Sequence, residues 1–534
     1  GRPTGRGVGA RRVAPSRTAG CAGMRSCRVQ APGRPLGVLP ALCTGLLLAL
    51  LAPPSARGWD PADRGTVVVR HSAPAGAGRA LLPGPVAVLV ELNQFHDEVL
   101  PSSIELLRSL GFPRVVVLKP FNTRGAEYLL GREVLGPAAG SVHLRNLGTL
   151  GGLGPQGLGK ELKRLEPGLI FVQTFQNYGQ GRNYTSQALP SLVGALRALP
   201  SLAVLAGCHN TGPTLRALQQ AAEDAPAVAH RFVPVAFGPG ARAELAEANR
   251  SAVLLVPAFL GPVQATPNAM GGEAGRLRGA GAKQDATAEP RKTALRPCPR
   301  ANAPPVSFVV FSGVDTLWLK SFPLLDLLGS AWPRNAPCLT VRVFGGSGVP
   351  ESLEAFDAIS ARVAVMTNYR VRLLRKAGSW AQGIPWGRAS DFVLPLVDEL
   401  SPRRSEYESG RKLTSSVAMA IALGKPLVAW KPLARAFGLE NRSVVYDGAQ
   451  GFPEAVMRAA RMRRERPGAY QRLREDLAAW QEGAMAMSVA HACALAPVRK
   501  AVEAAVGEHR CAARGLAGLA KTLSEQLDAA KHRH

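Results

Sequence analysis

The chain has 534 residues, of which 46% are hydrophobic, so it is long enough for two packed domains and too apolar for wholesale disorder. Its net charge of +27 would suit a nucleic-acid-binding protein. The excess is mostly arginine scattered among Ala, Gly and Pro, however, with no basic stripe between aromatic residues and no zinc-finger motif. We therefore predict no nucleic acid as a partner, and keep a protein that binds polyanions as a minor alternative.

Residues 1–58 are predicted to be a disordered leader that carries a targeting signal. After Met24, arginines precede an uncharged apolar run at residues 36–52, and small residues suited to cleavage follow it. The run is short for a helix that spans a bilayer, which favours a cleaved signal peptide and leaves an uncleaved type II membrane anchor as the alternative. Both predict the secretory pathway, as a protein of the ER or Golgi lumen, of its membrane, or secreted.

Two further features concern the compartment. N-x-S/T sequons, as expected of a glycosylated luminal chain, occur at Asn183, Asn249 and Asn441. The cysteines after the leader are Cys208, Cys298, Cys338, Cys493 and Cys511. Their odd number and wide spacing indicate neither a disulfide framework nor a metal site, so we expect mostly buried free thiols with one bridge at most.

From residue 85 onward, short apolar runs alternate with helical stretches. Strands are predicted at residues 86–90, 114–118, 168–172, 202–207, 230–237 and 252–257. Helices are expected between most of them, the first at residues 97–111. Strands that are apolar throughout and separated by helices are typical of a parallel sheet covered on both faces. Residues 85–260 are therefore predicted to form a Rossmann-like α/β domain, the acceptor domain in the interpretation below.

The pattern stops at residues 261–305, where Gly, Ala, Pro and charged residues predict a flexible linker or insertion. It then resumes, with strands predicted at residues 306–313, 338–346, 362–367, 391–396, 425–430 and 443–448 and helices at 317–331 and 350–359. Residues 306–465 are predicted to form a second Rossmann-like domain. Residues 466–534 are predicted to be C-terminal helices and a basic tail, with a break in the helical pattern at Pro467.

Several common ligand-binding motifs are absent from the sequence. No G-x-G-x-x-G follows the first predicted strand, no Gly-Lys-Ser/Thr completes a P-loop, and no G-x-S-x-G elbow occurs. This argues against a dinucleotide-dependent dehydrogenase in particular. The stretches "HDE" and "CHN", at residues 96–98 and 208–210, lack a third ligand at a suitable spacing, so we expect no metal.

The stretch "YESGRKLTSSVAMAIALGKPLVAW", residues 407–430, passes from charged, through hydroxyl-bearing, to apolar residues. A loop that ends in Thr-Ser-Ser brings hydroxyls and backbone N–H groups to a helix start, where the helix dipole adds partial positive charge and Lys412 adds a full one. This combination binds phosphate. The alternative is an N-capped core helix with an incidental lysine.

Three blocks resemble a known family. Residues 391–430, 308–322 and 91–111 are similar to the donor-site block, the first strand of the C-terminal domain and the N-terminal block of GT-B fold, family 1-like glycosyltransferases. The resemblance implies two tandem Rossmann-like domains that face a central cleft, with C-terminal helices. It also implies transfer of a sugar from a nucleotide-diphosphate donor to a hydroxyl of a glycan, protein or lipid acceptor, with no cofactor and no catalytic metal.

The resemblance also implies roles for individual residues. The implied donor-binding residues are Gly313, Lys320, Tyr407, Lys412, Thr414, Ser415 and Ser416. Those from Lys412 to Ser416 would hold the diphosphate, and Gly313 would let the backbone approach it. Lys320 would add charge or is an exposed helix residue. Tyr407 either lies against the nucleotide or packs within the domain.

One departure from the family concerns catalysis. Retaining enzymes of family 4 carry two glutamates eight residues apart, and alignment on the turn at residues 424–426 places Arg411 and Met419 at these positions. The usual retaining pair is therefore absent. This keeps a catalytically degenerate luminal protein, which binds carbohydrate or nucleotide, as the principal alternative to an active enzyme.

Candidate acid–base residues follow two predicted strands of the first domain. His96 comes after the first strand, at the edge where open α/β sheets bind ligands, and a histidine there can take a proton from an acceptor hydroxyl. Glu98 can act instead, or can cap the next helix through its dipole. His209 and Asn210 follow another strand and are predicted to line the acceptor side of the same cleft. Each histidine can alternatively be structural.

Overall fold

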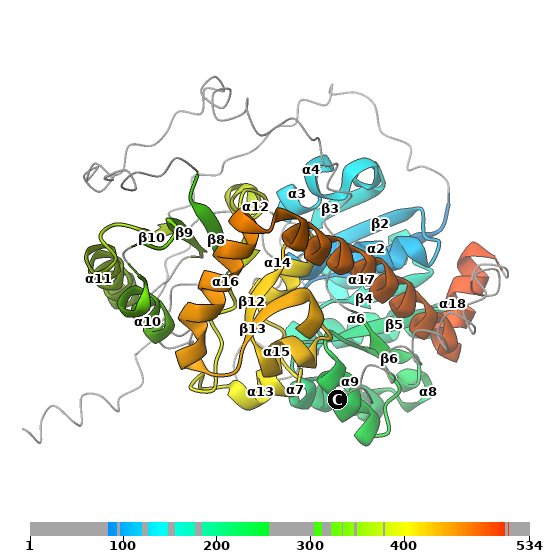
Figure 1. Ribbon diagram of the computed structural model, residues 1–534. Coiled ribbons are helices and arrows are strands. Elements are labelled where there is room, and N and C mark those ends of the chain that lie inside the picture. The colour runs from blue at the N-terminus through cyan, green and yellow to red at the C-terminus, as the bar shows by residue number, and fades with distance from the viewer. Residues whose placement is uncertain are drawn as a thin grey trace, which may run out of the picture. The chain divides into compact units, whose positions relative to one another are not determined.

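The computed structural model describes residues 84–92, 97–119, 126–147, 155–176, 184–255, 304–311, 322–333, 335–345, 350–376, 380–507 and 511. The predicted leader, nearly all of the predicted linker and most of the C-terminal tail lie outside these residues. The described residues contain two parallel sheets (Figure 1).

The first sheet has seven strands in the order β3-β2-β1-β4-β5-β6-β7. The strands are β1 Val86–Val90, β2 Arg114–Lys119, β3 Val142–Asn146, β4 Leu169–Val172, β5 Ala203–Cys208, β6 Phe232–Ala236 and β7 Val253–Leu254. The helical elements of this part are η1 Asp97–Val99, α2 Leu100–Ser109, α3 Ala126–Leu129, α4 Arg132–Leu135, η2 Gly136–Ser141, η4 Pro155–Gly159, α5 Lys160–Leu165, α6 Tyr184–Ala198, α7 Thr211–Asp224, α8 Pro226–Ala229 and α9 Pro239–Glu247.

Alternate residues of β1 belong to different cores, which shows why its sequence is apolar throughout. Leu89 packs in one core with Ile104 of α2, whereas Val88 packs in another with Leu192 of α6. Helices therefore cover both faces of the sheet. Each strand pair is parallel, so the predicted Rossmann-like α/β architecture is confirmed for this part.

The second sheet has six strands in the order β10-β9-β8-β11-β12-β13, again parallel. The strands are β8 Val306–Phe311, β9 Leu339–Phe344, β10 Val371–Lys376, β11 Phe392–Val393, β12 Leu427–Trp430 and β13 Ser443–Tyr446. The helical elements are α10 Phe322–Ala331, α11 Pro350–Met366, α12 Trp380–Arg388, α13 Arg404–Glu408, α14 Ser415–Leu423, α15 Lys431–Ala436, η6 Glu440–Arg442, η7 Ala449–Gly451, α16 Phe452–Glu465, α17 Pro467–Ala494 and α18 Ala496–Val506. Two parallel α/β sheets in tandem confirm the predicted fold class.

The strand predicted at residues 362–367 is wrong. These residues continue α11, where Val363 is fully buried and Arg362 pairs with Asp326 of α10. A short apolar run such as Val-Ala-Val-Met does not distinguish a buried helix from a buried strand by its period. The strand instead begins at Val371 and pairs with β9. The edge strand β3, of sequence VHLRN and half-buried throughout, has no apolar run that would predict it.

The C-terminal helices contribute to the cores of both sheets. On α17, Leu477 packs with the second sheet, whereas Val489 packs with the first. Val498 and Val502 of α18 belong to the core of the first sheet as well. The chain thus returns to its first domain at the end, and the predicted break between two helices at Pro467 is confirmed.

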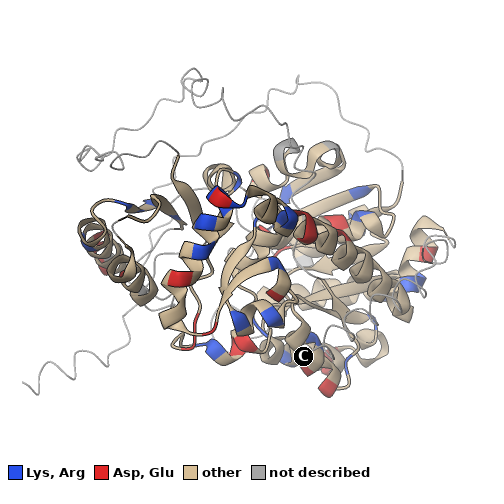
Figure 2. Ribbon diagram, viewed as in Figure 1, with Lys and Arg blue, Asp and Glu red and all other residues tan. Residues whose placement is uncertain are grey.

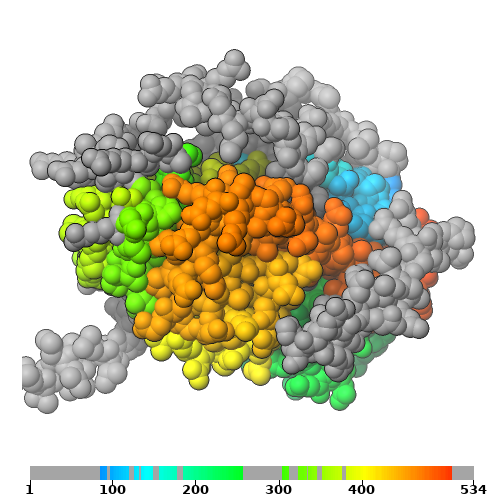
Figure 3. Space-filling view, viewed as in Figure 1, coloured from blue at the N-terminus to red at the C-terminus, as the bar shows by residue number. Residues whose placement is uncertain are grey.

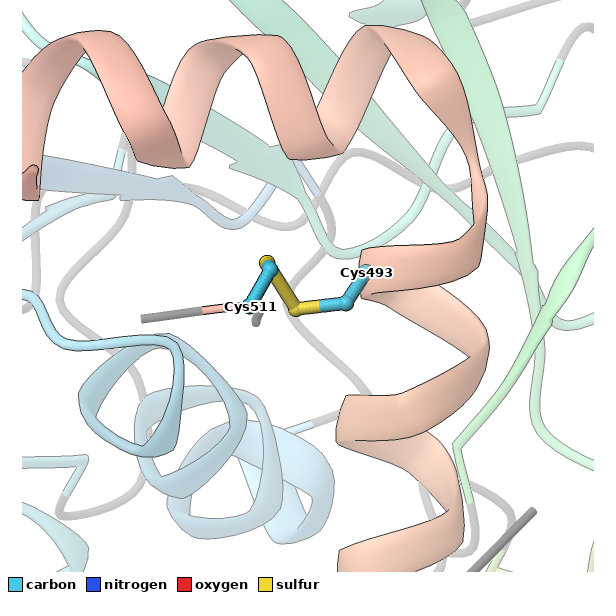
Figure 4. The surroundings of a disulfide bond; sticks show 2 residues. All are labelled: Cys493 and Cys511. Atoms are coloured by element: carbon cyan, nitrogen blue, oxygen red, sulfur yellow. A yellow bond between two sulfur atoms is a disulfide. The ribbon is translucent and has the colours of Figure 1, made fainter. Parts of the chain in front are cut away.

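The cysteines correct the expectation of mostly free thiols. Cys493, near the end of α17, forms a disulfide with Cys511, and their Cα atoms lie 5.5 Å apart (Figure 4). Cys338 is also disulfide-bonded. Cys208 is a buried free thiol, and burial raises its pKa to about 11. These disulfides could not be predicted from the spacing of the cysteines, because the tertiary fold decides which cysteines come together.

The predicted targeting and glycosylation features have no structural test. Asn249 and Asn441 are exposed, as acceptor asparagines must be, while Asn183 and the apolar run at 36–52 lie outside the described residues. In the part of the chain that the structure describes, no helix combines the length and apolarity needed to cross a bilayer. Glycosylation and the leader stay predictions.

We expect His491 to make stability depend on pH. Burial, and then the nearby charge of Arg242, lowers the pKa of this α17 histidine to about 4, below its ordinary 6.5. The unfolded chain therefore takes up a proton at a higher pH than the folded chain does, and stability falls as the pH drops from about 6.5 towards 4. After allowance for solvent screening, we expect a loss on the order of 1–2 kcal/mol.

Urea denaturation of the native protein and of His491→Gln, at pH 7 and pH 4.5, measures this effect. The native protein should lose more stability between the two pH values than the variant does. Equal losses would show that His491 does not titrate differently on folding.

Candidate functional site

The N-terminus of α14 is held at the carboxyl end of β8. The Ser416 hydroxyl accepts a hydrogen bond from the Phe311 N–H and donates one to the Phe311 carbonyl oxygen, each at 3.1 Å. The Thr414 hydroxyl caps the helix by accepting from the Val417 N–H at 3.1 Å. The helix ends at Gly424, whose φ of 59° is the left-handed conformation typical of a C-cap glycine.

These contacts limit how Thr414 and Ser416 can bind a ligand. Both hydroxyls are engaged within the fold, so phosphate binding through these residues, as predicted, would use backbone N–H groups. The first N–H groups of a helix, here those of Ser415 and Ser416, have no carbonyl partner within the helix. They coincide with the positive end of the helix dipole.

Lys412 and Tyr407 lie beside this helix start. Tyr407 is buried in the core of the second sheet, which agrees with the packing alternative, and burial raises its pKa to about 12. The Lys412 ammonium lies 5.9 Å from the centre of the Tyr407 ring and 3.9 Å from a carboxylate oxygen of Glu406. Partial burial, and then the charge of Arg403, lowers the pKa of Lys412. This cation is thus partly desolvated, which strengthens its attraction for an anion.

Glu98 reaches the same helix start from the first sheet. The Ser415 hydroxyl donates a hydrogen bond to its carboxylate at 3.1 Å. Glu98 also precedes α2 in η1, so its interaction with the dipole of that helix stays a prediction. Its negative charge lies at the N-terminus of α14 as well, where an anion is stabilised. His96, the other candidate base, lies outside the described residues, as do Gly313 and Lys320.

Arg411 and Met419 occupy the positions where a retaining enzyme would carry glutamates. Met419 is fully buried within α14. The Arg411 guanidinium lies 3.6 Å from a carboxylate oxygen of Glu244, which belongs to α9 of the first part. Neither side chain can take the role of a glutamate. The resemblance to retaining enzymes therefore does not extend to this pair.

Two glycines allow the backbones of the two parts to touch next to Arg411. A Cβ atom added to Gly240 would overlap the carbonyl oxygen of Ser409, and one added to Gly238 would overlap that of Gly410. Gly410 itself has a φ of 68°, the left-handed conformation that favours glycine. The loop before Lys412 thus rests directly on the start of α9.

We expect Gly240→Ala to disturb this contact. The added methyl group forces one backbone to move, and we expect a loss of about 1–3 kcal/mol in the free energy of unfolding. Gly194→Ala in α6 is a matched control, because a Cβ there meets no atom within 4 Å. Thermal unfolding compares the two variants. If both melted at the temperature of the native protein, the loops would not be in contact.

His209 and Asn210 follow β5, at the same edge of the first sheet as Glu98. The His209 ring lies 4.4 Å from the ring of Phe237. The Asn210 side-chain N–H donates to the Gln176 side-chain oxygen at 3.2 Å. Both residues are partly exposed. Their position at this edge fits the predicted acceptor side, and their function stays a prediction.

Sequence reasoning missed a buried polar network at this edge. Glu91 follows β1 and is fully buried, and its carboxylate accepts hydrogen bonds from the side chains of Gln173 and Thr174. Nearby, Asp97 and Lys119 form a buried ion pair. Buried charges are costly unless paired. The sequence signal was present, because a charged residue directly follows an apolar strand in each case, but the partners are distant in the chain.

No family model and no curated protein sequence matches this chain. Solved structures with a similar arrangement include HepE of Anabaena in complex with UDP. HepE is 13% identical to this chain, the match covers 83% of this chain and 100% of HepE, and the TM-score is 0.41. A UDP-forming trehalose-phosphate synthase from Burkholderia xenovorans is 12% identical over 78% of this chain and 99% of its own, with a TM-score of 0.41. The lipopolysaccharide outer core galactosyltransferase WaaB is 10% identical over 76% and 99%, with a TM-score of 0.36.

Proposed function

We propose that this protein binds a nucleotide-diphosphate sugar, with the diphosphate at the N-terminus of α14, and transfers the sugar to a hydroxyl acceptor. The observation that carries the proposal is the meeting of two sheet edges at this helix. The carboxyl end of β8 holds the helix start through Ser416, and Glu98 of η1, in the first domain, contacts the preceding residue, Ser415. Open α/β sheets bind ligands at this edge.

Apart from the Glu98 carboxylate, the groups at the helix start suit a diphosphate. Backbone N–H groups of Ser415 and Ser416, the helix dipole and the Lys412 ammonium all favour negative charge there. Breaking the bond between sugar and diphosphate adds charge to the leaving group. A fixed cation and oriented N–H donors stabilise that charge without reorganising.

Glu98 is the described carboxylate best placed to take a proton from the acceptor. It lies next to the proposed diphosphate site and is partly exposed. A carboxylate in that position can act as general base, or can orient the acceptor hydroxyl. His209 and Asn210 line the same sheet edge, and would contact the acceptor rather than the donor.

The alternative function is binding of a nucleotide or carbohydrate without turnover. It is favoured by the buried Met419 and the paired Arg411 at the positions of the retaining glutamates. The two functions share the nucleotide site. They differ in whether a bond is broken.

To separate the two functions, the protein is incubated with a panel of UDP- and GDP-sugars. Hydrolysis of the donor, transfer of the sugar and binding are each measured. We expect turnover with one donor class. Glu98→Gln should reduce turnover about 10²- to 10⁴-fold and keep nucleotide binding, while Glu105→Gln on α2 should leave both unchanged. Binding without turnover would select the alternative, and strong salt-dependent binding to nucleic acid that survives Lys412→Ala would support a polyanion-binding protein.

We also propose that the protein resides in the secretory pathway. The Cys493–Cys511 bridge and the bonded Cys338 support this, because disulfides persist in oxidising compartments and are rare in the cytosol. Immunolocalisation of the full chain tests it, and cytosolic staining would contradict it.

A further inference from the structure

A second cationic site lies at the amino end of the second sheet, at the other end of β8 from the proposed diphosphate site. Four basic residues lie near Asp391, which precedes β11. Two of them lie over the ring of Tyr470, whose hydroxyl donates to the Asp391 carbonyl oxygen. Lys425 lies in the turn before β12, Arg463 on α16, Arg474 on α17 and Arg342 on β9. We call Asp391 and these four basic residues the Lys425 cluster.

Asp391 compensates one of the four cations. Its carboxylate accepts a hydrogen bond from Arg463 Nε at 2.7 Å and another from the Ser307 N–H at 2.9 Å. Arg342 donates to the Ser307 hydroxyl at 2.6 Å, which is a neutral acceptor. Arg474 donates to the Gly424 carbonyl oxygen at 3.2 Å, again a neutral acceptor. Three positive charges of the cluster therefore have no anion in direct contact among the described residues.

Lys425 is the least satisfied member of the cluster. Within the described ranges its ammonium makes no hydrogen bond and no ion pair, although it is partly buried. Burial is the largest cause of a pKa lowered to about 8, followed by the charge of Arg474, while Asp391 offsets part of the shift. A partly desolvated ammonium with no acceptor from the protein is less stable than a paired one.

The C-terminus of α14 explains part of this arrangement. Its last carbonyl groups carry about half a negative charge, and cations there are favourable. The bond from Arg474 to the Gly424 carbonyl is such a contact. Half a charge does not balance three, however, so the helix end leaves most of the positive charge uncompensated.

The cluster is open to solvent on the side of α16. The Arg463 side chain is 34% exposed. Basic residues recur along α16 (Figure 2), and the orange atoms of α16 lie on the visible face in Figure 3. The Arg463 member of the cluster can therefore be reached by a small anion from this side.

We propose that the Lys425 cluster binds a doubly charged oxyanion, the phosphate group of a monoester. Two negative charges offset most of the three uncompensated positive charges. Arginine presents paired N–H donors that fit the oxygens of such a group, and the lysine adds a point charge beside them. The site is separate from the diphosphate site, because the two lie at opposite ends of α14 and of β8.

The reaction of Lys425 with an amine-acylating reagent at pH 8, followed by mass spectrometry, tests the proposal on the full chain. Inorganic phosphate or sulfate should raise the pKa of Lys425 by about one unit and thereby reduce labelling about five-fold at that pH. Sodium chloride at equal ionic strength should give less than two-fold protection. No difference between phosphate and chloride would overturn the proposal.

Three variants locate the effect. Arg474→Gln should lose the protection by phosphate, whereas Arg472→Gln, an exposed residue on the same helix, and Lys412→Ala, at the other end of α14, should keep it. Protection that persists in Arg474→Gln would place the anion elsewhere and overturn the proposal. If Arg474→Gln does not fold, the thermal shift caused by phosphate provides the test, and a shift in Lys425→Gln equal to that of the native protein overturns it.

Discussion

Replacing Cys511 by serine should lower the free energy of unfolding by about 3 kcal/mol, because the bridge to Cys493 closes a loop with a sequence separation of 18. The bridge connects the end of α17 to the chain beyond α18 (Figure 4). Between its cysteines, Val498 and Val502 fill part of the core of the first sheet. Without the bridge, α18 can separate from that core at a lower denaturant concentration.

Urea denaturation without a reducing agent measures this effect. Cys208→Ser is the matched control, because it removes a buried thiol that is not bridged. We expect the control to lose less stability than Cys511→Ser does. Reduction of the native protein also breaks the bridge of Cys338, so it should lower stability at least as much as Cys511→Ser does. A midpoint for Cys511→Ser equal to that of the native protein would show that the bridge does not hold α18 in place.

Lys412→Ala should weaken binding of a nucleoside diphosphate about 10- to 100-fold. A hydrogen bond to a charged group contributes about 1.5–3 kcal/mol, and each 1.4 kcal/mol is a factor of about ten in affinity. The substitution leaves the cap of α14 intact, because Thr414 supplies it. The lost affinity therefore reports on the cation rather than on the helix.

Isothermal titration with UDP and GDP measures the change. Lys431→Ala is the control, since this lysine pairs with Glu440 and Asp447, at 3.8 and 3.7 Å, and lies on another helix. Its affinity should equal that of the native protein. Equal affinity in Lys412→Ala as well would remove Lys412 from the site.

The α/β architecture could be predicted because each buried strand is a continuous run of apolar residues, which is visible in the local sequence. Residues such as Leu89 and Val88 enter two separate cores, and this requires an apolar residue at every position. The prediction was wrong where a short apolar run lies in a buried helix, as at Val363. It gave no indication of β3, whose half-buried residues carry no such signal.

The candidate site could be predicted only in part, because its contacts connect distant residues. The helix start, with Thr414 as its cap, follows from the local sequence. The contacts of Ser415 with Glu98 and of Arg411 with Glu244 join residues that are far apart in the chain. The hydrogen bonds between the Ser416 hydroxyl and the last residue of β8 depend on tertiary packing. The sequence therefore could not show that only the backbone N–H of Ser416 is available to a ligand.

The exchange of backbone amide hydrogens at residues 411–417 tests most directly whether the N-terminus of α14 binds the diphosphate. A nucleoside diphosphate that binds in the titration should slow exchange at the Ser415 and Ser416 amides, and the nucleoside without phosphates should not. Unchanged exchange at the Ser415 and Ser416 amides would contradict the proposed donor site. Slower exchange around Lys425 and residues 463–474 instead would contradict it as well.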